Sequence, residues 1–240
     1  MTSGYLLESP VALSARAVRF LRSGSHRVTV DRGLTGDRLR REINRVHGRP
    51  DDDIVTLLAQ LQTRYSGLTY TSGFFQSKVT FAPVCEPEHP DEELEILYAV
   101  ETGSIAGASV KPTGQVEIGI DALSTIEFGN LDALIECDAL YAEASRSGPE
   151  RRSYSTPGAV GELLDHLMSD PSLSLRPAPE ATGHHTHWLT ADDTMVALEG
   201  AWSEVSTMPP MIRSWPRHDH AASRLDAVLR SFRAERVGDR

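Results

Sequence analysis

Histidine is the residue type whose spacing in this sequence could do chemistry. The stretch GHHTHW places His185 and His187 two positions apart, and the stretch RHDH does the same for His218 and His220. On a β-strand, residues two apart share one face and lie about 7 Å apart, so the first pair could bind zinc. A catalytic zinc site needs a third ligand and an open position, which the second pair would have to supply. A zinc-dependent hydrolase is therefore one alternative for the function.

The other interpretation is that these histidines bind no metal and lie exposed to solvent on a strand edge and at the start of a helix. Residues two apart on a helix point about 200° apart, so His218 and His220 rarely bind one metal together. The sequence contains no His-Glu-x-x-His motif, no Gly-x-Ser-x-Gly elbow and no glycine-rich phosphate loop. We therefore expect no metal, no cofactor and no enzymatic activity.

The two cysteines and the apolar segments indicate the compartment. Cys85 and Cys137 have no ligand-like spacing, so we expect free, buried thiols in a reducing environment. No apolar run approaches the ~20 residues of a membrane helix. Charged residues interrupt the N-terminus, which rules out a signal peptide. We expect a cytoplasmic protein that does not contact a membrane.

Charge is distributed unevenly along the chain. Residues 1–50 carry ten arginines and four acidic residues, a net charge of +6, whereas residues 86–143 carry fourteen acidic residues and one lysine, a net charge of −13. The formal net charge of −10 argues against nucleic acid as a partner, because phosphate binding needs a cationic surface. An acidic surface instead steers basic proteins toward it. Alternatively, these acids form a solvated face or pack against the basic N-terminal segment.

Hydrophobic spacing predicts helices on both sides of a β-rich middle. We expect helices over 9–24, 36–46, 50–65, 130–144, 156–167 and 220–237. Short apolar runs in the middle predict strands, and the turn KPTG predicts a hairpin with a polar face containing Gln115, Glu117 and Gly119. A second hairpin is expected from HTHWLT and TMVALEGAW.

This order of elements predicts an α+β fold. We expect an antiparallel β-meander flanked by helices, with an N-terminal helical extension and a C-terminal hairpin plus helix. Residues 1–40 would form the basic helical extension, and residues 41–240 a single α+β domain.

Two stretches resemble the SUKH superfamily. The helix over 50–65 runs into TRYSGLTY, which is similar to the family's amphipathic helix followed by an aromatic-Gly-(Gly)-hydrophobic turn. Here Ser66 stands where a second glycine is common. The stretch STIEFGNLDALIECDALY resembles the late helix of actinobacterial members. The resemblance covers roughly residues 40–145, extending at most to residue 235, and residues 1–40 lie outside it.

The resemblance implies a binding protein and not an enzyme. SUKH proteins are α+β domains, and many are bacterial immunity proteins that neutralise a cognate toxin, often a nuclease, by stoichiometric occlusion. Binding residues often lie in loops, so the acidic loop CEPEHPDEE and the residue two positions after it supply the candidate partner-binding residues. These residues are Glu86, Glu88, Asp91, Glu92, Glu93 and Glu95. The alternatives are a flexible solvated loop and, for the whole chain, a scaffold or regulatory protein of the same fold.

Overall fold

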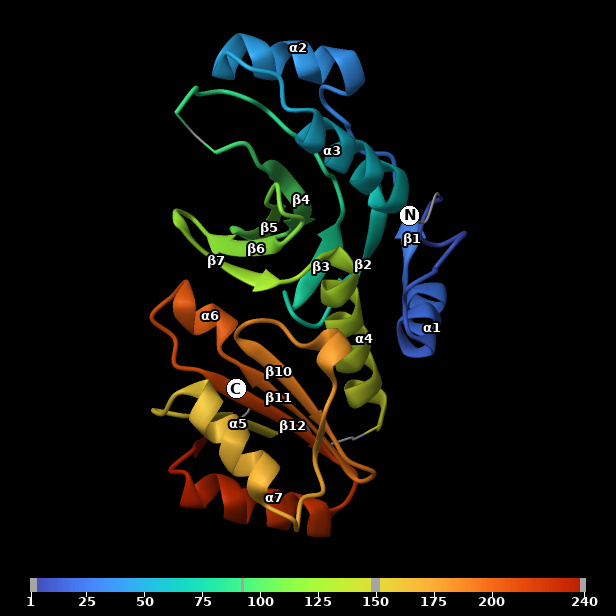
Figure 1. Cartoon of the computed structure of the whole chain (residues 1–240). Coiled ribbons are helices and arrows are strands. Elements are labelled where there is room, and N and C mark those ends of the chain that lie inside the picture. The colour runs from blue at the N-terminus through green and yellow to red at the C-terminus, as the bar shows by residue number, and fades with distance from the viewer. Residues whose placement is uncertain (1–3, 92, 148–151, 238–240) are drawn as a thin grey trace. The chain divides into compact units, whose positions relative to one another are not determined.

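The structure, a computed structural model, describes residues 4–91, 93–147 and 152–237 (Figure 1). Backbone contacts divide the chain into two compact units, Met1–Asp132 and Ala133–Arg240, here called the N-terminal unit and the C-terminal unit. Both units combine helices with antiparallel sheets, so the predicted α+β class is confirmed. This division falls at a different place from the expected boundary after residue 40. None of the helices in the described ranges is long and apolar enough to cross a membrane.

The N-terminal unit is built on an antiparallel sheet that follows chain order. Its helices are α1 (Ala15–Gly24), α2 (Gly36–His47) and α3 (Asp52–Tyr65). Its described strands are β1 (His26–Arg27), β2 (Leu68–Ser72), β3 (Ser77–Thr80), β4 (Ile96–Thr102), β5 (Ala106–Val110), β6 (Val116–Ile120) and β7 (Leu123–Phe128). Strand β1 pairs with β2, and the ring of Phe20 in α1 lies 5.1 Å from that of Tyr70 in β2. The expected N-terminal extension therefore packs onto this sheet.

Helix α1 starts later than its sequence suggests. The predicted start at residue 9 is wrong, because Ser14 is the N-cap and its hydroxyl accepts the backbone N–H of Ala17 at 3.2 Å. The preceding Ala12 has a left-handed φ of 80°, which no α-helix accommodates. The stretch before α1 is instead a turn, in which the N–H of Leu13 donates to the carbonyl of Pro10.

Helix α3 leads into a turn that only glycine can make. The Asp51 side chain caps the helix by accepting the N–H of Ile54 at 3.0 Å, and Ile54 and Leu58 are buried. After Tyr65, Gly67 has φ +80°, and a Cβ built there would lie 2.0 Å from the carbonyl oxygen of Val28. The Gly67 carbonyl accepts the N–H of Val28, and its own N–H donates to Phe81. This turn therefore ties the end of α3 to the residues that directly follow β1 and β3.

The C-terminal unit is a second antiparallel sheet with helices on both faces. Its described strands, in spatial order, are β13 (Glu235–Val237), β8 (Arg152–Ser155), β12 (Met211–Pro216), β11 (Thr194–Glu199), β10 (Thr186–Thr190) and β9 (Arg176–Pro177). Its helices are α4 (Leu131–Ser147, which begins in the N-terminal unit), α5 (Val160–Ser169), the 3₁₀ turn η1 (Pro179–Ala181), α6 (Ala201–Glu204) and α7 (Asp219–Ser231).

Alternation along these strands separates two buried faces. Leu189 and Val196 are paired across β10 and β11 and belong to the apolar cluster that includes α5 and α7. Figure 1 shows these two helices beside the strands. Trp188 points the other way, because its indole N–H lies 3.3 Å from Cys137 Sγ of α4. Both predicted free, buried cysteines are confirmed.

Both expected hairpins are confirmed, as β5–β6 and β10–β11. Among the described residues, seven strands lie outside the predicted set: β1, β2, β7, β8, β9, β12 and β13. The segment 145–155, between the helices predicted over 130–144 and 156–167, contains the end of α4 and strand β8. Its residues 148–151 lie outside the described part. The last predicted helix, 220–237, is too long, because α7 stops at Ser231 and β13 follows.

Replacing Gly67 with alanine tests the turn after α3. The new Cβ would meet the Val28 oxygen in a left-handed conformation, so we expect a loss of more than about 3 kcal/mol in the free energy of unfolding, enough to abolish soluble expression of a marginal domain. The control is Gly114→Ala, where φ is +86° but nothing lies within 4 Å. It should lose only about 1 kcal/mol. Equal losses in urea unfolding would contradict the role assigned to the Val28 contact.

Candidate functional site

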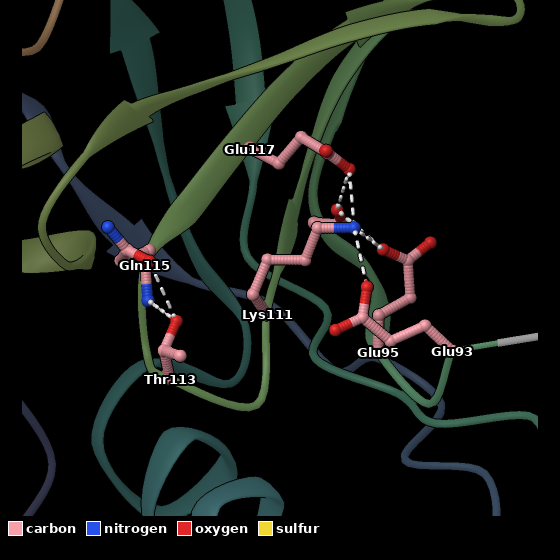
Figure 2. A network of polar contacts seen from close by, with 7 residues as sticks. Glu93, Glu95, Lys111, Thr113, Gln115 and Glu117 are labelled. Carbon is pink, nitrogen blue, oxygen red and sulfur yellow. Dashed lines mark hydrogen bonds and ion pairs between the residues drawn. The ribbon is translucent and has the colours of Figure 1, made fainter.

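One lysine is surrounded by three carboxylates in the N-terminal unit (Figure 2). Lys111 Nζ lies 3.1 Å from Glu95, 3.2 Å from Glu117 and 3.6 Å from Glu93, measured to Oε2 of each. Its side chain is 19% exposed. Burial lowers the pKa of Lys111, but the hydrogen bonds to Glu95 and Glu117 outweigh that effect, so the pKa lies above its usual value. The ammonium therefore stays charged at neutral pH and leaves the group with a net negative charge.

The β5–β6 hairpin positions this lysine. The N–H of Lys111 donates to the carbonyl of Gln115, and Gly114 closes the turn with φ +86°. Alternation then places Ser109 and Glu117 directly opposite each other on the exposed face. The polar face predicted for residues 115–119 is thus confirmed, and it carries the acceptor for Lys111.

The acidic segment before β4, residues 86–95, is held at both ends. Cys85 and Ile96 are buried, and Val84 forms a bridge with Leu97. At its far end, Glu93 and Glu95 both reach Lys111. We call residues 86–95 the acidic loop.

The predicted partner-binding residues divide into two groups. Glu86, Glu88, Asp91 and Glu93 are exposed, as expected for a binding loop. Glu95 is half-buried against Lys111 and lines a groove described below, so its main contact lies within the unit. Glu92 lies outside the described residues. Among the ion pairs of the described residues, no arginine pairs with any member of the first group.

The acidic surroundings also affect Cys85. Burial, and then the carboxylates of Asp51, Glu86 and Glu95, raise the pKa of the Cys85 thiol to about 11. A thiol reacts as the thiolate, so Cys85 is neutral and unreactive at pH 7.

A groove of about 290 Å³ adjoins the carboxylates on the exposed face of β4–β6. Gly107 and Gly119 stand opposite each other in β5 and β6. Both line the groove. A Cβ at Gly107 would lie 3.3 Å from the Val100 carbonyl oxygen and one at Gly119 3.0 Å from that of Leu123, so neighbouring backbone packs closely against both glycines. Acidic side chains of Glu95, Glu117 and Asp121 also line the groove. We call this feature the β4–β6 groove.

Two exposed apolar side chains flank the same groove, Tyr98 at 62% exposure and Ile105 at 69%. Tyr98 sits in a bulge: Ile96 pairs with Val110 and Val100 with Ala108, so three residues of β4 face one residue of β5. Tyr98 adopts φ +50° there. A left-handed aromatic residue within a strand is strained, and the sequence pattern of β4 gives no sign of it.

The histidine clusters lie in the C-terminal unit and are used differently. His218 is the N-cap of α7, where its Nδ1 accepts the N–H of Ala221 at 3.1 Å, and His220 is exposed in the first turn. His187 is half-buried in β10, and burial, followed by the charge of His185, lowers the pKa of His187. His185 Nδ1 lies 3.9 Å from Glu204. Within the described ranges, no three His, Cys, Asp or Glu side chains are grouped so that they could hold a metal ion.

A buried polar cluster on α4, β11 and β12 was not predicted. Glu199 accepts the Tyr141 hydroxyl at 2.6 Å and pairs with Arg213 at 3.0 Å. All three side chains are buried, and Tyr141 lies edge-on to Trp188. Burial, together with Glu199, raises the pKa of Tyr141. The sequence signal for this cluster was Glu199 at the end of an otherwise apolar strand.

Comparisons of the chain with protein-family models, with curated proteins and with solved structures give no match. The resemblance to the SUKH superfamily therefore stays a prediction, and the function must be argued from the groove and the loop themselves.

The contribution of Lys111 can be measured by replacing it with methionine. Three carboxylates would lose their cation, so we expect a loss of about 1–2 kcal/mol at pH 7. Because the folded pKa is raised, this contribution is present below the unfolded pKa of about 10.4 and disappears as pH rises through the folded pKa. The difference between wild type and Lys111→Met in urea unfolding should thus shrink as the pH rises through the folded pKa of Lys111. Lys78→Met, at the exposed second lysine, is the control and should change stability little.

Strain at Tyr98 predicts an inverted preference between glycine and alanine. At φ +50° glycine is unstrained, so Tyr98→Gly should be about 1 kcal/mol more stable than Tyr98→Ala. At the exposed neighbour Glu101, which lacks a positive φ, the order should reverse because glycine weakens a strand. Chemical denaturation of Tyr98→Gly, Tyr98→Ala, Glu101→Gly and Glu101→Ala measures the four stabilities. If glycine and alanine rank in the same order at both positions, strain at Tyr98 is excluded.

Proposed function

We propose that this protein is an immunity-type binding protein that neutralises a basic protein toxin by stoichiometric occlusion. The observation that carries the proposal is the acidic loop, whose Glu86, Glu88 and Asp91 are exposed while Lys111 anchors its far end. A loop whose two ends are held needs less ordering on binding than a free one, which favours affinity. A nuclease is a suitable target, because a groove that binds phosphates is cationic.

The acidic loop acts before the two proteins touch, while the partner is still approaching by diffusion. Like charges that are exposed and not cancelled by arginines produce a field that attracts a basic partner, and this raises the association rate. Lys111 removes only part of the charge in its own group, since three carboxylates surround one ammonium. Lys111 therefore anchors the acidic loop, and the exposed carboxylates of the loop remain negatively charged.

Toxin neutralisation is tested by coexpressing the chain with the protein encoded by the neighbouring gene. We expect that protein to be toxic alone, to be tolerated together with this chain, and to elute with it as a 1:1 complex in size-exclusion chromatography. A neighbouring protein that is harmless, or whose toxicity persists beside soluble chain, would contradict the proposal.

Association kinetics test the role of the loop within such a complex. The variant Glu86→Gln/Glu88→Gln/Asp91→Asn should associate at least five-fold more slowly at low salt and show a flatter salt dependence, because rim charges act mainly on the association rate. A matched control removes three exposed carboxylates of the C-terminal unit, Glu162→Gln/Asp165→Asn/Asp192→Asn. If both variants slow association equally, net charge rather than the loop is responsible.

A further inference from the structure

The β4–β6 groove offers what the acidic loop lacks, a concave surface with both apolar and charged groups. Its volume of about 290 Å³ lies at the lower end of the range for ligand pockets. It is lined by residues of β4, β5 and β6 and by the segment that follows β6. A partner side chain could therefore contact several strands of the sheet at once.

The apolar side chains at the groove are unusually exposed for their size. Tyr98 and Ile105 are more than half exposed, although both line a concave surface. The bulge in β4 holds Tyr98 there with a left-handed backbone. Buried tyrosines and arginines dominate the energetics of protein interfaces, and a rigid, exposed tyrosine is suited to such contacts.

The charged side chains at the groove are all acidic. Glu95 and Glu117 lie on one side and are shared with Lys111, and Asp121 follows β6. An arginine side chain matches this combination: its guanidinium binds carboxylates with two parallel hydrogen bonds, stacks on aromatic rings, and its methylene stem packs on apolar surface.

We propose that the β4–β6 groove docks an arginine of a partner protein, with the guanidinium at Asp121 and Glu117 and an adjacent apolar side chain against Tyr98 and Ile105. The partner is the basic protein of the proposed function, on which the biological meaning rests. The acidic loop then attracts this partner over long range, and the groove holds it at short range.

A short peptide tests the docking without knowledge of the partner. The full-length ¹⁵N-labelled chain is titrated with acetyl-Leu-Arg-Leu-amide and with its citrulline analogue, which has the same shape and no charge. We expect saturable amide shifts at Gly107, Gly119 and Tyr98, and at least three-fold weaker binding of the citrulline peptide. Shifts confined to other residues, or equal binding of the two peptides, would overturn the proposal.

Variants then assign the contacts. Tyr98→Gly and Asp121→Asn should each weaken binding of the arginine peptide at least three-fold, and Asp121→Asn should also reduce the preference over citrulline. Both replacements suit the positive φ at their positions, and unchanged amide spectra elsewhere verify the fold. Leu123→Ser is the control, because Leu123 is 58% exposed but does not line the groove. Binding that survives both test variants, or that Leu123→Ser weakens equally, would show that the peptide binds elsewhere.

Two further outcomes separate this proposal from the proposed function. If the chain binds the arginine peptide as expected but neutralises no toxin, arginine docking in the groove is supported and the immunity function is contradicted. If the Tyr98→Gly variant neutralises the toxin with undiminished affinity, the immunity function is supported and docking in the groove is contradicted. Sedimentation velocity identifies another occupant: dimerisation that Tyr98→Gly abolishes would mean that a second copy fills the groove, and would overturn the assignment to a different protein.

Discussion

The Lys111 ammonium carries one positive charge, and the three carboxylates around it carry three negative charges. Two of these carboxylates belong to the segment before β4 and the third to β6, so a single side chain connects the acidic loop to the exposed face of the sheet. Without this cation, like charges only a few ångströms apart would repel one another. The loop and the groove therefore share a common support, and a change at Lys111 affects both.

Glycines allow backbone segments of the N-terminal unit to approach one another closely. Gly67 allows the Val28 carbonyl to approach the backbone after α3, which brings β1 beside β2. Gly107 and Gly119 act in the same way in β5 and β6, because a Cβ there would lie 3.3 Å from the Val100 oxygen and 3.0 Å from the Leu123 oxygen. Glycine thus permits close backbone approach both at the turn after α3 and beside the groove.

Local patterns predicted the elements whose burial follows a simple period. The alternation in 115–120 marked the polar face of a hairpin, and the apolar spacing with acidic first turn marked α3. Strand β12 was missed because it is buried nearly throughout and includes Arg213, whose charge is neutralised by Glu199 on the neighbouring strand β11. The acidic loop was found from composition, whereas the groove depends on cross-strand register and on a bulge, which a single sequence does not reveal. The histidines drew attention by spacing alone, yet His218 serves as a helix cap.

Several features of the exposed face of β4–β6 oppose stability. An exposed tyrosine in a left-handed conformation, two glycines in neighbouring strands and a group of carboxylates with one cation are each unfavourable for folding. Strain of this kind persists only where the surrounding structure enforces it, and it concentrates at functional sites. Here all three features meet at one groove, next to the acidic loop. Their coincidence favours a surface shaped for binding over a solvated face, because a face selected for solubility alone needs charge but neither strain nor a hollow.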